Sequence, residues 1–152
     1  MKKVGKPSKS LIDSISKKLA CSDAFIIISP EWHGMVPAGL KNFFLMWSNG
    51  ELAHKPALIV TVSSGDGGSY PVAELRMSSY KNNRICFLPE HLIIRNVESV
   101  FNDNEIDNNS SSQAYFENRL DYCLKQLLTY GKAFKQIRES DTVSIKKYGS
   151  GM

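Results

Sequence analysis

The chain has 152 residues, of which 42% are hydrophobic and 22% charged, and its formal net charge at pH 7 is +4. That is the length of one domain and the composition of a globular protein with a buried core. No apolar run approaches the roughly 20 residues of a membrane-spanning helix, and no secretory signal follows the first lysines, so we expect one cytoplasmic domain over residues 1–152 without membrane contact.

The N-terminus is basic. The first twenty residues contain Lys2, Lys3, Lys6, Lys9, Lys17 and Lys18 against a single acidic residue, Asp13. Such a patch either meets phosphates or nucleic acid, or is a solvated helix face. Aromatic side chains are not interleaved with the lysines, as a stacking surface would require. We therefore favour the solvated face and predict no nucleic-acid partner.

Helices and buried-type strands alternate over the first half of the chain. After a loose start over residues 1–10, Leu11, Ile12, Ile15 and Leu19 have the spacing of one helix face, which predicts a helix ending near Cys21. The apolar run 24–29 lacks alternation, which is typical of a strand covered on both faces. A helix over 38–47 follows, with Pro37 at its entrance, and then a second such strand over 57–62.

The second half continues the same alternation. We expect a helix over 71–81, with Val72, Leu75, Ser79 and Met77 facing inward, and a short strand over 85–88. Pro89 interrupts that strand, and an extended segment over 92–97 follows. The polar segment 102–112 predicts a mobile loop, residues 113–138 a long amphipathic helix, and residues 140–152 a tail.

Cysteine and histidine residues are scattered. Cys21, Cys86 and Cys123 form no CxxC pair, and His33, His54 and His91 are isolated. We therefore expect buried or half-buried free thiols in a reducing compartment, and no metal site.

The order strand–helix–strand–helix–strand predicts an α/β domain with a parallel sheet between helices. In such sheets ligands bind beyond the carboxyl ends of the strands. Two loops of unusual composition leave predicted strand ends, "SPEWHG" at 29–34 and "SSGDGG" at 63–68.

Both loops allow a structural and a functional interpretation. The glycines of the second loop either shape an ordinary turn or let the backbone approach a flat ligand closely, with free amides near a helix start. In the first loop, Trp32 either packs on a neighbouring helix or flanks a planar ligand, and His33 is either solvated or part of the same site.

The stretch "SDAFIIISPEWHGMVPAGLKNFFLMW" resembles "ADAIIIVTPEYNGSIPGALKNALDW" of the NADPH-dependent FMN reductase family, which has a flavodoxin-like fold. The resemblance continues through "ELAHKPALIVTVSSGDGG", "VAELRMSSY" and "RICFLPEHLIIRNV", over roughly residues 7–100. It implies a flavodoxin-like, three-layer α/β domain that binds FMN and uses NADPH or NADH as co-substrate.

The resemblance also implies the site. The flavin ring would rest against Pro30, Glu31, Trp32, His33 and Gly34, and its pyrimidine side against Ser63, Ser64, Gly65, Gly67 and Gly68, mostly through backbone groups. Trp32 replaces the family's tyrosine and His33 its asparagine. Hydride would pass from nicotinamide to flavin, and electrons onward to a quinone, a flavin or a similar acceptor. This chemistry requires no catalytic side chain, and we name none.

The chain departs from the family at its start. No counterpart precedes residue 7 for the family's first strand, its Gly-Ser phosphate loop or its second strand. This predicts an N-terminally truncated domain. The alternative is a genuinely short chain that covers its open sheet edge by dimerising. We expect such a chain to bind FMN weakly, if at all. The rival function is a non-enzymatic flavodoxin-like module that only self-associates.

A homodimer is expected from the helix that spans residues 40–47. Its apolar side chains Leu40, Phe43, Phe44, Met46 and Trp47 surround much of the helix, more than one packed face needs. The resemblance likewise implies dimers through this helix.

Overall fold

A computed structural model describes residues 8–140 and 142–149. Three parallel strands form one sheet in the order β1-β2-β3. The strands are β1 (Phe25–Pro30), β2 (Pro56–Val62) and β3 (Cys86–Ile94), and the helices are α1 (Lys9–Cys21), α2 (Ala38–Met46), α3 (Ser69–Ser78) and α4 (Ser110–Glu139), with short 3-10 turns at η1 (Val97–Ser99) and η2 (Glu105–Asp107). The predicted architecture of a parallel sheet between helices is confirmed.

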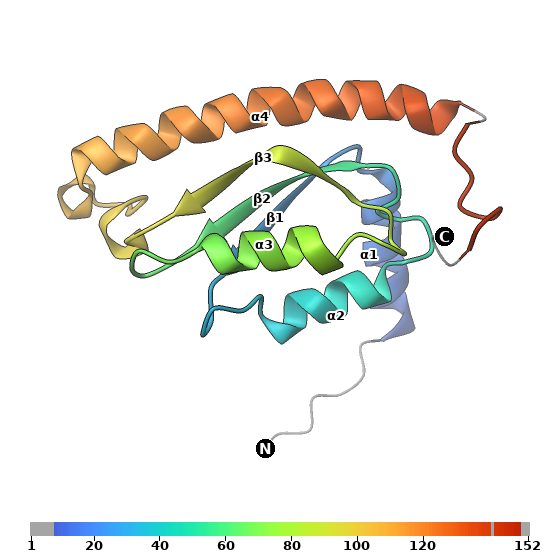
Figure 1. Ribbon diagram of the computed structural model, residues 1–152, viewed down its shortest axis with the longest axis horizontal. Helices are drawn as coiled ribbons and strands as arrows, with labels where there is room; N and C mark the ends of the chain where they lie inside the picture. Colours follow the sequence, from blue (N-terminus) through green and yellow to red (C-terminus); the bar gives the residue numbers. More distant parts are fainter. Residues whose placement is uncertain (1–7, 141, 150–152) are drawn as a thin grey trace, which may run out of the picture.

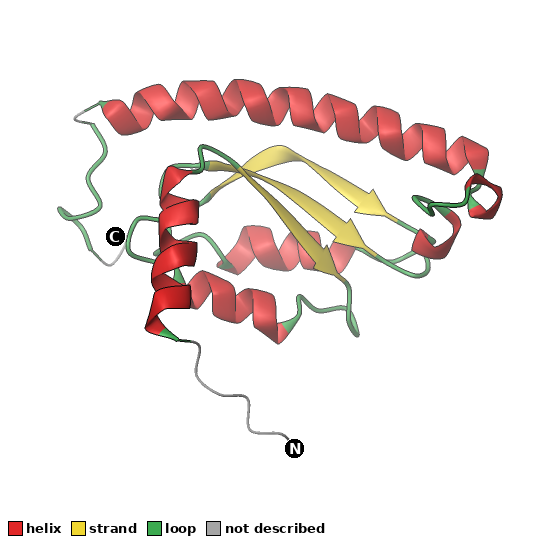
Figure 2. Cartoon of the chain, turned by 180° about the vertical axis from the view of Figure 1, so that it is seen from behind, coloured by secondary structure: helices red, strands yellow, loops and turns green. Residues whose placement is uncertain are grey.

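Helices cover both faces of the sheet (Figures 1 and 2), and an apolar core lies on each side of it. On one face, α1, α2 and α3 pack against the strands around Ile27, Ile59 and Leu75. On the other face α4 covers the sheet, through a row of side chains that includes Phe116, Cys123 and Leu127. Burial on both faces explains why β2, the central strand, reads as an uninterrupted apolar run.

Strand β1 is not covered on both faces, so that prediction is wrong. Ile26 is 46% exposed and Ile28 63% exposed. Both lie on the α4 face of the sheet, because Ile26 pairs with the buried Leu58 and Ile28 with Val60. Helix α4 packs mainly on β2 and β3, and among residues 8–140 and 142–149 the strand β1 has a strand neighbour on one side only. The outer edge of β1 is therefore open on this face.

Strand β3 continues through Pro89 instead of breaking there. Ala57 of β2 pairs with Phe87, and Ile59 with His91, so the register shifts between them. The extra residues on β3 form a bulge, which accommodates a proline that cannot donate a ladder hydrogen bond. Residues 85–88 and 92–97, predicted as separate extended segments, thus belong mostly to one strand.

Other boundaries differ slightly from the predictions. Helix α3 ends at Ser78 and exposes Met77, against the expectation that Met77 faces inward. The segment 102–112 contains η2 and the first turn of α4, which Asn109 caps by accepting a hydrogen bond from the Ser112 amide at 3.0 Å. Cys21 is exposed, whereas Cys86 is half-buried and Cys123 buried.

The two chain ends lie partly outside the described residues. Residues 1–7 of the expected loose start, and residues 141 and 150–152 of the expected tail, are among those not described. Residues 142–149 contact the domain, since the Tyr148 carbonyl accepts a hydrogen bond from Arg84 Nη2 at 2.5 Å. Within the described part of the chain, no helix is long and apolar enough to cross a membrane.

A buried lysine ties α1 to the loop before β2. Lys55 is 4% exposed, and its ammonium donates to the carbonyls of Leu19, Ala20 and Glu51 at 2.7, 2.8 and 2.8 Å. The last carbonyls of a helix have no partner within the helix. Lys55 satisfies two such groups at the C-terminus of α1.

Candidate functional site

The two loops predicted as a site lie side by side at the carboxyl end of the sheet. Pro30, the last residue of β1, pairs with Val62, the last residue of β2. The Glu31 amide extends this pairing by donating to the Val62 carbonyl at 2.9 Å. Parallel strands therefore bring residues 30–34 and 63–68 together, although about thirty residues separate them in the sequence.

The first loop contains a tight turn over Trp32–Met35. The amides of Trp32 and Met35 each donate to the other residue's carbonyl, at 3.1 and 2.9 Å. Between them, His33 and Gly34 have φ angles of 51° and 75°. These angles lie in the left-handed region, which residues other than glycine rarely adopt. Trp32 is 63% exposed and His33 is exposed. Most of the Trp32 side chain is therefore left uncovered by the described residues.

Both loops present backbone amides without a protein partner. Within the described residues, no hydrogen bond is donated by the amides of His33 and Gly34 in the first loop, or of Ser64, Asp66 and Gly67 in the second. Backbone amides without a protein partner suit a ligand with carbonyl or ring-nitrogen acceptors. The space beside Gly65 is also open, since a Cβ there would meet nothing within 4 Å.

Residues just after β3 hold the second loop in place. Arg95 Nε donates to the Gly67 carbonyl at 3.0 Å. The Asn96 amide donates to the Gly65 carbonyl at 3.1 Å, and its side-chain Nδ2 to Asp66 Oδ1 at 3.1 Å. Neither Arg95 nor Asn96 was singled out from the sequence. The sequence did contain one signal for them, because both residues follow the third predicted strand and so lie at the same edge of the sheet as the two loops.

Glu31 joins the two loops. Its Oε2 accepts a hydrogen bond from the Gly68 amide at 2.5 Å. A Cβ on Gly67 would lie 2.8 Å from Glu31 Oε1, and a Cβ on Gly68 would lie 2.3 Å from Ile93 Cγ2. Close packing and a φ of 99° together require a glycine at Gly68, whereas a side chain at Gly67 would displace the Glu31 carboxylate.

Glu74 of α3 anchors the far end of the first loop, and sequence reasoning missed it. Its Oε2 accepts the Val36 amide at 2.8 Å, and its Oε1 pairs with Lys41 Nζ at 2.5 Å. The hydrogen bond from Lys41 and that from the Val36 amide hold the pKa of Glu74 below its ordinary value. Glu74 therefore connects α3, the loop and α2 as a charged group.

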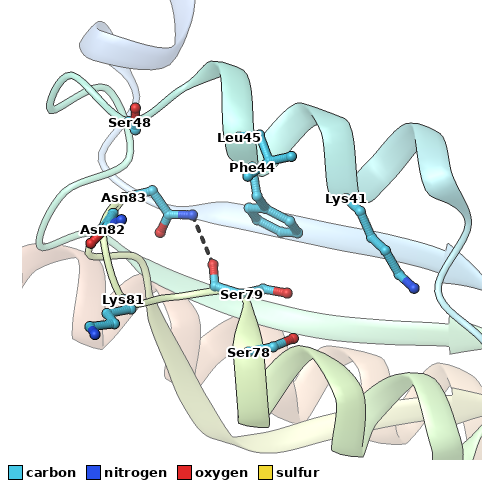
Figure 3. Close-up of a pocket in the computed structure, with 9 residues that line it drawn as sticks. All are labelled: Lys41, Phe44, Leu45, Ser48, Ser78, Ser79, Lys81, Asn82 and Asn83. Carbon is cyan, nitrogen blue, oxygen red and sulfur yellow. Dashed lines mark hydrogen bonds between the residues drawn. The ribbon is translucent and has the colours of Figure 1, made fainter.

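A pocket of about 450 Å³ lies elsewhere, between the C-terminal ends of α2 and α3 (Figure 3). Its lining includes Lys41, Phe44 and Lys81, and Asn83 Nδ2 donates there to the Ser79 carbonyl at 2.8 Å. No residue of the two loops lines it. It is a gap between helix ends and is separate from the candidate site.

Solved structures with a similar fold include several oxidoreductases. An oxidoreductase from Corynebacterium diphtheriae aligns at 16% identity with a TM-score of 0.60, over 89% of this chain and 66% of its own. A flavoenzyme NAD(P)H:(acceptor) oxidoreductase from Paracoccus denitrificans aligns at 17% identity with a TM-score of 0.55, over 81% and 76%. An NADPH-quinone reductase from P. pentosaceus aligns at 17% identity with a TM-score of 0.50, over 80% and 73%.

At these identities the structural likeness shows the fold alone. The chain spans 66% of the length of the Corynebacterium protein and about three quarters of the other two. A search of curated protein sequences found no significant match.

The sequence profile of the NADPH-dependent FMN reductases matches residues 2–99. The matched region contains all three strands and both loops. The family's description names the FMN and the nicotinamide cofactor that the sequence resemblance implied, and the flavodoxin-like fold is confirmed. The chain therefore belongs to the NADPH-dependent FMN reductase family.

Proposed function

We propose that the two loops bind the isoalloxazine ring of FMN, and that the protein is an NAD(P)H-dependent flavin oxidoreductase. The observation that supports this most is the group of five unpartnered amides on two adjacent loops at the carboxyl end of the sheet. Residues 30–34 and 63–68 fit a flat ligand, because their glycines leave the backbone accessible.

The residues have distinct parts in this proposal. The amides of Ser64, Asp66 and Gly67 donate to acceptors on the pyrimidine side of the ring, and those of His33 and Gly34 to its other edge. Trp32, Met35 and Tyr70 are exposed and supply apolar surface beside the turn. When bound, FMN supplies the redox chemistry, accepting a hydride from nicotinamide and passing electrons onward. No side chain is needed as acid, base or nucleophile.

We also propose a quinone, a flavin or a similar planar molecule as the electron acceptor. The exposed His33 ring at the tip of the turn is placed to donate a hydrogen bond to such an acceptor. Two proteins of similar fold are named as an NADPH-quinone reductase and an NAD(P)H:(acceptor) oxidoreductase. The free thiols of Cys21, Cys86 and Cys123 fit a reducing compartment such as the cytoplasm.

The proposal is tested by titrating the purified chain with FMN and with lumiflavin, which lacks the ribityl phosphate, while following flavin fluorescence. Because the proposed contacts reach only the ring, we expect the two to bind with similar affinities. NADPH should then bleach the visible absorption of the bound flavin.

Two glycine substitutions make a matched pair for this titration. A Cβ on Gly65 or on Gly39 would meet nothing within 4 Å, so both variants should fold. Gly65→Leu should block flavin binding, whereas Gly39→Leu, on α2, should not. A chain that remains colourless with FMN and lumiflavin would instead favour the non-enzymatic module.

We further propose a homodimer through α2. Leu45 and Met46 are exposed, whereas Phe44 and Trp47 are buried and Leu40 and Phe43 pack against the core. Less apolar surface is therefore free than the sequence suggested. Light scattering should give a dimer for the wild type and for Leu128→Lys on α4, and a monomer for Leu45→Lys. A monomeric wild type at micromolar concentration would contradict the proposal.

A further inference from the structure

The Trp32–Met35 turn is connected to helix α3 at three points. Before the turn, Glu31 accepts the Gly68 amide at the N-terminus of α3. Within the turn, Gly34 lies beside the Tyr70 ring, whose Cδ2 is 3.6 Å from the position of a Gly34 Cβ. After the turn, the Val36 amide donates to Glu74 at 2.8 Å. One carboxylate thus fixes each end of the turn.

The two carboxylates act in opposite directions. Glu31 extends from the loop to the helix and places a negative charge at the helix N-terminus, where no side chain of α3 itself provides a cap. Glu74 extends from the middle of the helix to the loop. The turn is anchored to α3 by one side chain from the loop, Glu31, and one from the helix, Glu74. Substitution of either glutamate should free one end of the turn.

The turn requires such anchors. His33 adopts a positive φ of 51°, a conformation that costs a residue with a side chain and persists only where the surroundings enforce it. The two hydrogen bonds between Trp32 and Met35 close the turn, but they do not fix its position relative to the second loop. Glu31 and Glu74 supply that fixed position.

The position of the turn relative to α3 matters because amides without a protein partner lie both on the turn and in the loop before α3. His33 and Gly34 are on the turn, and Ser64, Asp66 and Gly67 precede the N-terminus of α3. A rigid planar ligand that uses both groups needs them at a constant separation. Glu31 Oε2 accepts a hydrogen bond from the Gly68 amide, so this oxygen holds the two loops together.

We propose that Glu31 and Glu74 are positioning residues, which clasp the Trp32–Met35 turn to α3 and so set the spacing of the amides that receive the flavin ring. The clasp itself is a property of the flavin-free chain. Its effect on flavin rests on the proposed function.

The test compares Glu31→Ala, Glu31→Gln, Glu74→Ala and Glu74→Gln with the control Glu98→Gln. Glu98 is exposed, lies in η1, and belongs to neither loop. Two quantities are measured for each variant, the dissociation constant for lumiflavin and the hydrogen-exchange rates of the Gly68 and Val36 amides by NMR. Urea unfolding shows which variants are folded.

We expect each alanine variant to bind lumiflavin about tenfold more weakly, the loss that one charge-assisted hydrogen bond typically causes. The Gly68 amide should exchange faster in Glu31→Ala, and the Val36 amide faster in Glu74→Ala. Each glutamine variant keeps an acceptor oxygen, and so should recover most of the affinity. Glu98→Gln should match the wild type in both measurements.

Two results would overturn the proposal. Unchanged exchange of both amides in the alanine variants would show that the clasp does not exist. Faster exchange with unchanged lumiflavin affinity would show that the clasp does not position the ligand. A wild type that binds neither flavin would refute the proposed function and the positioning role with it, while the exchange rates would still decide whether the clasp exists. If one alanine variant does not fold, the other still decides the question, because each carboxylate fixes one end of the turn.

Discussion

Two neighbouring glycines in the second loop have very different tolerances for a side chain. A Cβ on Gly68 would stand 2.3 Å from Ile93 Cγ2, and the residue has a positive φ, whereas a Cβ on Gly65 meets nothing within 4 Å. A composition-based view treats both as turn glycines. Only the packing around each distinguishes them.

We therefore expect Gly68→Ala to lower the free energy of unfolding by about 2–4 kcal/mol, from steric overlap and backbone strain together. Gly65→Ala should change it by less than about 0.5 kcal/mol. Urea unfolding of the flavin-free chain measures both. Equal effects of the two substitutions would contradict this account of the loop.

At the residue scale, the sequence predicted that the two loops meet but not the contacts that join them. The motif around Pro30 and the glycines of 63–68 indicated both loops, and the order of the strands indicated that they meet. The hydrogen bonds from Gly68 to Glu31 and from Val36 to Glu74 join residues 37 and 38 apart. Contacts of that separation leave no periodic pattern, so Glu74 could not be identified beforehand, whereas the position of Arg95 and Asn96 after a third strand was a signal for these two.

At the element scale, the end of α1 depends on a side chain from another segment. Lys55 donates three hydrogen bonds from a buried position, two of them to the last turn of α1. In Lys55→Met the carbonyls of Leu19, Ala20 and Glu51 all lose this donor, and within the described residues only that of Leu19 keeps another, the Ser22 amide. We expect the free energy of unfolding to fall by about 2–3 kcal/mol.

Lys17→Met is the matched control, because Lys17 is an exposed lysine of α1 itself. It should change stability by less than about 0.5 kcal/mol. Urea unfolding followed by circular dichroism would report both variants. If Lys55→Met were as stable as the wild type, the free energy of desolvating the buried ammonium would equal the stabilisation from its hydrogen bonds.

The elements that were predicted least well are the two edge strands. An apolar run such as 24–29 has the same composition in an edge strand as in a central one, so the exposure of Ile26 and Ile28 could not be read from it. Proline normally ends a strand, and the bulge that accommodates Pro89 depends on pairing with β2. The helices, which carry periodic patterns, were placed to within a few residues.

At the scale of the whole molecule, acid should destabilise the fold in two stages. Burial, and then Arg84 and Arg138, lower the pKa of His54 below 6.5, and burial, and then Arg76, lower that of His91. The unfolded chain therefore binds more protons as the pH falls below about 6.5, and the free energy of unfolding decreases. Glu74, whose pKa is also lowered, adds a second decrease below about 4.5.

Urea unfolding at a series of pH values measures this profile. His91→Asn should reduce the decrease between neutral pH and about 5 and leave the decrease below 4.5 unchanged. Glu74→Gln should do the reverse. A free energy of unfolding that stays constant as the pH falls from 7.5 to 5 would refute the assignment of the upper stage to the histidines.

The two tryptophans occupy opposite environments in this molecule. Trp47, at the end of α2, is 4% exposed, and Trp32, on the turn, is 63% exposed. The intrinsic emission of the protein thus has a blue component that reports the integrity of the core and a red component that reports the turn. A flavin ring beside Trp32 would quench the red component more strongly than the blue, whereas unfolding would shift the blue component to the red, so one spectrum separates occupancy of the loops from loss of the fold.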